Sequence, residues 1–134
     1  MTGTTAATGQ PAFRRVGRLR RGYDVAEVDG LRERGVVLEG YSPLKATDLD
    51  DPVLGGIAAE HGVTPAQVVI AWHLALDHVV IPKSVTPSRI AENFAATEVT
   101  LDDDDLKAIE KLDRGPDGRV GPDPATFDNG ARTD

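Results

Sequence analysis

A short strand, a basic turn and a capped helix follow one another without a gap, and this order most constrains what the chain can fold into. Residues 79–81 (Val-Val-Ile) are β-branched and apolar, which is typical of a buried strand. Thr86 is a favourable N-cap residue, and Pro87 suits the first helical position because its missing N–H costs nothing there. The sequence therefore predicts a helix over residues 87–94 directly after the strand.

The turn before this helix predicts an anion pocket. Unpaired N–H groups and the positive end of the helix dipole face a turn that holds Lys83 and Ser84. Arg89, Glu92 and Asn93 stand at positions i, i+3 and i+4, so they share one face of the helix. A cation, an acceptor and an amide on one face can hold a phosphate at one end and contact a purine edge at the other.

The remaining elements give a βαβα order. Residues 36–38 (Val-Val-Leu) form a compact β-branched run that predicts a buried strand, with 41–44 as its exit loop. Cap, proline and glycine signals predict further helices at residues 25–31, 52–61, 64–76 and 102–112. Strand, helices, strand and helix in this order indicate parallel strands with right-handed crossovers. The fold class is therefore α/β.

Length and composition allow one modest core. The chain has 134 residues, of which 40% are hydrophobic, and it contains no cysteine. Disulfides, thiolate zinc sites and cysteine nucleophiles are therefore excluded, and the three histidines show no ligand spacing, so no metal site is expected. There is no apolar run long enough for a membrane span and no secretory leader pattern, so we expect a cytoplasmic protein without membrane contact.

The charge is divided unevenly along the chain. Residues 1–34 hold seven Arg against four acids, whereas residues 35–134 hold eight Lys or Arg against eighteen acids, for a net charge of −7. An acidic body argues against nucleic-acid binding, which needs clustered cations. Lys83 and Arg89 are local exceptions, and they favour a small phosphorylated ligand.

Several stretches together resemble the C-terminal part of an aldo-keto reductase, closest to the bacterial branch that reduces diketogluconates and related carbonyls. The resemblance runs over residues 36–129, about two-thirds of the chain, in the family's order. The matching stretches are 35–44, which contains Tyr41-Ser42-Pro43-Leu44, 64–74, 79–93, which contains Ile81-Pro82-Lys83-Ser84, and 121–127. The resemblance implies a (β/α)8 TIM barrel that binds NADPH at the C-terminal ends of its strands.

The resemblance also implies roles for individual residues in NADPH binding. Tyr41 looks like the aromatic that stacks on the nicotinamide, and Ser42 and Leu44 look like the loop that touches the pyrophosphate. Glu92 and Asn93 resemble the residues that contact adenine.

The adenosine 2′-phosphate is the part of the cofactor most specific to NADPH. Lys83, Ser84 and Arg89 resemble the clamp on this phosphate, with Val85 and Thr86 lining it. This agrees with the pocket inferred from capping and spacing. A lysine and a bidentate arginine against a dianion also predict a preference for NADPH over NADH.

No segment matches the half of the family that carries catalysis. The family uses a tyrosine general acid tuned by a lysine, an aspartate and a histidine, and no residue here takes those places. Hydride transfer to a carbonyl needs a proton donor within reach, so we expect no carbonyl reduction by this chain alone. A full barrel takes ~250 residues and eight strands, so two strands give an unclosed fragment with open edges. A second chain that supplies the missing half is a possible partner.

The front of the chain carries a separate resemblance. Residues 13–29 are similar to the motif that opens DivIVA-type domains, which bind curved membrane, although no heptads follow. We therefore divide the chain into a basic N-terminal segment (1–34), disordered or with a short helix, a truncated barrel region (35–115) and an irregular tail (116–134).

Plainer interpretations stay open beside these. Lys83 and Arg89 could be ordinary surface charges, and Tyr41 could be a core residue. His73 is expected to be a packing residue, and His61 and His78 to be solvated helix ends. Three hypotheses for function follow: a reductase region that keeps the cofactor site without self-sufficient catalysis, a non-catalytic NADPH-binding or interaction module, and a gene remnant.

Overall fold

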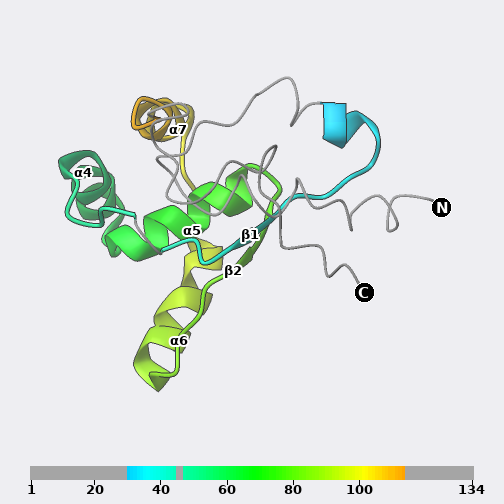
Figure 1. Ribbon diagram of the computed structural model, residues 1–134. Coiled ribbons are helices and arrows are strands. Elements are labelled where there is room, and N and C mark those ends of the chain that lie inside the picture. Colours follow the sequence, from blue (N-terminus) through cyan, green and yellow to red (C-terminus); the bar gives the residue numbers. More distant parts are fainter. Residues whose placement is uncertain (1–29, 45–46, 114–134) are drawn as a thin grey trace, which may run out of the picture.

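The computed structural model describes residues 30–44 and 47–113 (Figure 1). Residues 30–33 are helical and lead into the first strand. The elements that follow are β1 (Glu39–Tyr41), α4 (Pro52–His61), α5 (Pro65–Ala75), β2 (Val79–Ile81), α6 (Pro87–Ala95), the short 3-10 helix η1 (Ala96–Glu98) and α7 (Asp103–Glu110). The predicted helix over 25–31 and the tail lie mostly or wholly outside the described residues.

The two strands pair in parallel. Glu39 lies opposite Val79, and Tyr41 lies opposite Ile81. Helices α4 and α5 form the connection between the strands, as the βαβα order predicted. Within the described ranges the sheet has only these two strands and does not close, so the expected barrel fragment is confirmed.

The first strand lies later in the chain than predicted. The run 36–38 was expected to be the strand, but the paired residues are 39–41. Val36 and Leu38 are buried while Val37 is 51% exposed, so the run is not buried on both sides. The carbonyl of Leu38 accepts a hydrogen bond from the Val79 amide at 2.9 Å. The apolar run therefore leads into the sheet, and the position of β2 sets where pairing begins.

The helix ends follow the predicted caps closely. Asp51 accepts a hydrogen bond from the Val53 amide at 2.9 Å and starts α4, and Gly62 ends it in the left-handed conformation. Thr64 and Gln67 form the predicted capping box of α5. Asp102 and Asp105 form a second capping box at the start of α7. Each of these ends satisfies backbone groups that a helix leaves unpaired.

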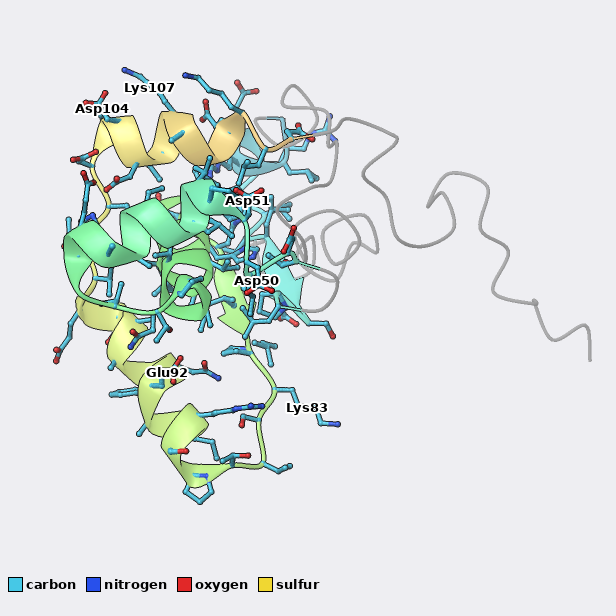
Figure 2. All side chains as sticks on the ribbon, turned by 90° about the vertical axis from the view of Figure 1, so that its left-hand side faces the viewer. Asp50, Asp51, Lys83, Glu92, Asp104 and Lys107 are labelled. Atoms are coloured by element: carbon cyan, nitrogen blue, oxygen red, sulfur yellow. The ribbon has the colours of Figure 1, made fainter. Side chains whose placement is uncertain are left out.

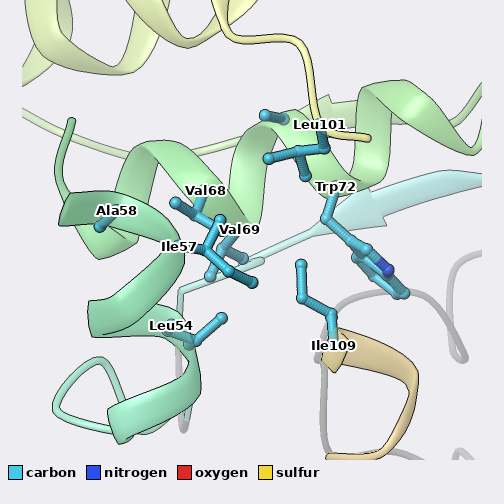
Figure 3. Packing of buried hydrophobic residues seen from close by; sticks show 9 residues of the cluster. Leu54, Ile57, Ala58, Val68, Val69, Trp72, Leu101 and Ile109 are labelled. Carbon is cyan, nitrogen blue, oxygen red and sulfur yellow. The ribbon is translucent and has the colours of Figure 1, made fainter. Parts of the chain in front are cut away.

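The hydrophobic core lies where α5 packs against α4 and α7. Figure 3 shows Leu54 and Ile57 of α4 against Val68 and Val69 of α5. The buried members of the cluster are Leu54, Ile57, Ala58, Val68, Val69, Ala71, Trp72, Leu101 and Ile109. α5 therefore forms the centre of the domain, as its apolar residues on several faces indicate.

Helix α6 is the exception, because it buries none of its side chains. It projects away from the core in Figure 1. Its apolar residues Ile90 and Phe94 are 52% and 78% exposed. They line an open hollow of about 640 Å³ together with Leu74 and Val79. An uncovered apolar surface therefore runs along the free side of β2 and α6.

No helix in the described part of the chain is both long and apolar enough to cross a bilayer. The segment with the DivIVA-like residues and the 116–134 tail lie outside the described residues, so their assignments stay predictions.

Candidate functional site

A hollow of about 750 Å³ gathers most of the residues that the sequence singled out. It lies between the β2–α6 turn, the face of α6 and the first residues of α5. In Figure 2, Lys83 and Glu92 lie in the lower part of the view, and Lys107 of α7 lies at the opposite, upper end. The predicted site residues that line the hollow are Leu44, Lys83, Ser84, Val85, Thr86, Arg89, Glu92 and Asn93.

The two cations of the hollow have no acidic partner in the residues that the structure describes. Neither Lys83 nor Arg89 takes part in an ion pair there. Both side chains belong to exposed residues, so their charges reach solvent. An anion that enters the hollow would meet two positive charges without having to displace a carboxylate from them.

The start of α6 is arranged differently from the prediction. Thr86 occupies the N-cap position, but its side chain makes no capping hydrogen bond. The hydroxyl of Ser84 instead accepts a hydrogen bond from the Thr86 amide at 3.2 Å, which shapes the turn. Pro87 has no N–H, so the first backbone N–H groups of α6 that can donate belong to Ser88 and Arg89. These donors are not satisfied by Thr86 and face the same turn as Lys83.

Glu92 is held in place from another helix. The hydroxyl of Thr64 donates to Oε1 of Glu92 at 2.7 Å, and Nε2 of Gln67 donates to the carbonyl oxygen of Glu92 at 2.9 Å. Glu92 and Asn93 are partly buried, in contrast to the exposed residues at the start of α6. The hollow thus has a cationic end at the turn and a fixed acceptor and an amide on the helix.

Of the predicted site residues whose side chains the structure describes, only Ser42 does not line this hollow. Tyr41 ends β1, but its side chain lies outside what the structure describes. Ser42 follows with a φ of 51°, a left-handed conformation that is uncommon for serine. Pro43 next to it is fully buried, and Leu44 reaches both the core cluster and the hollow. The loop after β1 therefore contributes Leu44 to the hollow.

Sequence reasoning missed other residues that border the hollow. They are Leu49, Asp50, Thr64, Pro65 and Ala66. The cap signal at Thr64 was visible in the sequence, but its contact with Glu92 joins positions 28 residues apart. Asp50 adds a carboxylate to the rim. Nothing in the local pattern around it indicates that the chain brings it to this place.

The histidines differ from the sequence prediction at one position, His78. His73 is fully buried, as expected of a packing residue, and its ring lies 4.8 Å from that of Trp72. His78, directly before β2, was expected to be solvated but is only 4% exposed, because its ring lies beside those of Trp72 and His73. His61 was also expected to be solvated, and it is an exposed residue at the end of α4, where its Nε2 lies 2.7 Å from Oδ2 of Asp105.

Burial changes the acid–base behaviour of two of these rings. Burial, with a smaller effect of His78, lowers the pKa of His73 to about 3. Burial and the nearby Arg32 guanidinium lower the pKa of His78 to about 4, although the Asp77 carboxylate acts to raise it. Both imidazoles are therefore neutral at pH 7. Neither lines the 750 Å³ hollow, and we give them no part in its chemistry.

The described residues contain no group of three or more metal-ligating side chains. The hollow offers two cations, helix N–H groups, a carboxylate and an amide, which suits a phosphorylated nucleotide better than a metal ion.

The comparison with known proteins bears on the same region. The model of the aldo/keto reductase family matches residues 15–114.

The chain belongs to the aldo/keto reductase family.

Relatives with known names give the same assignment. An aldo-keto reductase of Mycolicibacterium smegmatis is 50% identical over 94 residues, which are 69% of this chain and 34% of the relative. Methylglyoxal reductase DkgA of Salmonella typhimurium is 53% identical over 92 residues, 66% of this chain and 33% of the relative. The chain thus spans about a third of the length of the curated relatives that it matches.

Solved structures resemble the fold as well. The crystal structure of Gox0644 in its apo form has a TM-score of 0.75 and 43% sequence identity, and covers 83% of this chain and 41% of that one. A Gox0644 variant in complex with NADPH gives the same values. An aldo/keto reductase from Brucella melitensis has a TM-score of 0.62 and 37% identity, and covers 72% of this chain and 36% of that chain.

The family match begins at residue 15, within the stretch that carries the DivIVA-like residues. The boundary at residues 34 and 35 was drawn from the resemblance of the later stretches alone. The division into segments 1–34, 35–115 and 116–134 therefore stays a prediction.

Proposed function

We propose that this chain binds the adenosine end of NADPH, as part of an oxidoreductase of the aldo/keto reductase family. The observation that carries the proposal is the placement of Lys83, Arg89, Glu92 and Asn93 around one hollow at the start of α6. The NADPH complex of Gox0644, a structural neighbour, supports the choice of cofactor.

In this proposal the cationic end of the hollow receives the adenosine 2′-phosphate. Arg89 offers a planar pair of donors that suits two phosphate oxygens, and Lys83 adds a mobile point charge. Ser84 and the first free amides of α6 add uncharged donors. Val85 and Thr86 line the phosphate end of the hollow. Because NADH lacks this phosphate, the arrangement favours NADPH.

The other end of the hollow receives the base. Glu92 supplies an acceptor for the exocyclic amino group of adenine, and Asn93 supplies both a donor and an acceptor. Leu44, in the loop after β1, adds an apolar side chain to the lining of the hollow. On the family resemblance, we assign Ser42 and Leu44 to the pyrophosphate and Tyr41 to the nicotinamide.

Bound NADPH would supply the hydride for reduction of a carbonyl. We assign no catalytic residue to this chain, so the proton donor comes from outside the matched region, in a second polypeptide or segment that completes the barrel. The unpaired edge of β2 leaves backbone hydrogen-bonding groups uncovered, which suits packing against such a segment. The exposed side chains of Ile90 and Phe94 offer it an apolar surface. A small carbonyl compound is the expected substrate class, as for the methylglyoxal reductases among the relatives.

Titration with NADPH tests the proposal directly. The nicotinamide fluorescence of NADPH is followed as the 134-residue chain is added, for the wild type and for Lys83→Ala and Arg89→Ala. Loss of one charged hydrogen-bonding group is expected to raise the Kd about tenfold or more in each variant. Lys107→Ala is the matched control, because it removes an exposed cation on α7 at the far end of the molecule.

Two results would contradict the proposal. One is the absence of saturable NADPH binding by the wild type, which would favour the gene-remnant hypothesis. The other is an equal loss of affinity in the Lys107→Ala control, which would mean that overall charge and not this hollow attracts the cofactor. Turnover of a small aldehyde by the chain alone would overturn the statement that the proton donor lies elsewhere.

A further inference from the structure

Two side-chain hydrogen bonds from α5 reach helix α6, and both end at one residue. Helix α6 buries no side chain, and its apolar residues Ile90 and Phe94 face outward. The side-chain hydrogen bonds that reach it from α5 both end at Glu92, one at the carboxylate and one at the backbone carbonyl. The orientation of Glu92 thus depends on α5 as well as on its own helix.

The two donors from α5 are themselves fixed in place. Oγ1 of Thr64 accepts a hydrogen bond from the Gln67 amide at 3.3 Å, and Oε1 of Gln67 accepts one from the Thr64 amide at 3.0 Å. This capping box leaves the hydroxyl proton of Thr64 and the side-chain amide group of Gln67 free to donate elsewhere. Both groups donate to Glu92. The capping box therefore satisfies backbone groups at the start of α5 and also fixes the position of Glu92 on α6.

We propose that Thr64 and Gln67 are positioning residues that set the purine specificity of the hollow through Glu92. The inference rests on the proposed function. Thr64 engages Oε1 of the carboxylate, which leaves Oε2 as an acceptor for an exocyclic amino group on the base. A purine with an oxygen at this place would set acceptor against acceptor. Adenine is thereby selected over hypoxanthine.

A substitution at Thr64 can separate this role from helix capping. Thr64→Asp keeps an acceptor that caps α5, removes the hydroxyl proton, and sets a second carboxylate against Glu92. Thr64→Ser keeps the hydroxyl and is the conservative variant. Asp102→Ala is the matched control, because it breaks the capping box of α7 and leaves Thr64, Gln67 and Glu92 untouched.

The first measurement needs no nucleotide. Hydrogen–deuterium exchange of the α6 amides is compared among the full-length variants. Thr64→Asp is expected to speed exchange in α6 about tenfold relative to the wild type, whereas Thr64→Ser and Asp102→Ala leave it unchanged. Equal exchange in Thr64→Asp and the wild type would overturn the positioning role, whether or not NADPH binds.

The second measurement compares NADPH with its reduced hypoxanthine analogue. The wild type and Thr64→Ser are expected to prefer NADPH, and Thr64→Asp is expected to reduce that preference about tenfold. If the wild type binds NADPH but Thr64→Asp keeps the full preference, the inference is wrong and the proposed function stands. If the wild type binds neither nucleotide, the proposed function fails, and the assignment of purine specificity fails with it.

Discussion

Nε2 of His61 lies 2.7 Å from Oδ2 of Asp105, and this hydrogen bond joins the end of α4 to the start of α7. Asp105 is buried and also belongs to the capping box of α7, so one carboxylate closes a helix end and links two helices.

Removal of the His61 ring should therefore loosen the packing of α4 on α7. We expect His61→Ala to lower the free energy of unfolding by about 1–2 kcal/mol, because a buried carboxylate loses one of its donors. Urea denaturation followed by the fluorescence of Trp72 measures the change. Glu60→Ala, at an exposed neighbouring position, should leave the unfolding midpoint within error. An equal loss in both variants would mean that this bond is not responsible for the stability change, and helix propensity cannot explain a loss because alanine favours a helix most.

Replacing each of two glycines in and at the end of α4 by alanine should change the stability of the protein in opposite directions. Gly55 lies inside the helix with open space around it, so Gly55→Ala should stabilise the protein by about 0.5–1 kcal/mol. Gly62 ends the helix at a φ of 65°, so Gly62→Ala should destabilise it by about 1 kcal/mol. Thermal unfolding of both variants checks the pair. Stabilisation by Gly62→Ala would contradict the left-handed end of α4.

The buried histidines should make the protein sensitive to acid. Their pKa values are lowered in the folded state to about 3 for His73 and about 4 for His78, from 6.5 in the unfolded chain. The unfolded state therefore binds more protons below pH 6.5, and the stability that is present above that pH is lost as the pH falls toward 4. Each ring contributes a slope of up to about 1.4 kcal/mol per pH unit.

A variant without one of the rings isolates this effect from the titration of carboxylates. His73→Leu should flatten the dependence of the unfolding free energy on pH between 4 and 6.5. It should cost little at pH 7, because neither ring nitrogen of His73 has a hydrogen-bond partner in the described part of the chain. Urea midpoints in a pH series test both points. An unchanged slope in His73→Leu would show that this ring does not carry the acid response.

Local signals in the sequence were sufficient to predict where the helices of the fold begin and end. The caps at Asp51, Thr64 and Asp102 and the glycine at position 62 act within one turn, so they can be recognised from a few neighbouring residues. The turn and helix start at α6 were predicted in the same way. The cap of this helix was only partly predicted, because Ser84 and not Thr86 bonds across the turn.

Features that depend on distant parts of the chain were not predictable. The first strand begins at Glu39 because β2 lies opposite, and no pattern around residues 36–38 carries that information. His78 is buried because Trp72 and His73 lie beside it after the chain reverses between α5 and β2. The bond between Thr64 and Glu92 likewise follows from how α6 is placed on α5.

The last prediction concerns how Arg89 would recognise phosphate. Arg89→Lys keeps the positive charge in the hollow but loses the planar pair of donors. If Arg89 binds the adenosine 2′-phosphate, the NADPH affinity of Arg89→Lys should lie between that of the wild type and that of Arg89→Ala, and NADH affinity should not change. Added salt should weaken NADPH binding more in the wild type and in Arg89→Lys than in Arg89→Ala, because screening acts on the positive charge that only Arg89→Ala lacks. Fluorescence titrations with NADPH and NADH at low and high salt measure both effects. An equal loss of affinity for the two nucleotides would place Arg89 away from the 2′-phosphate.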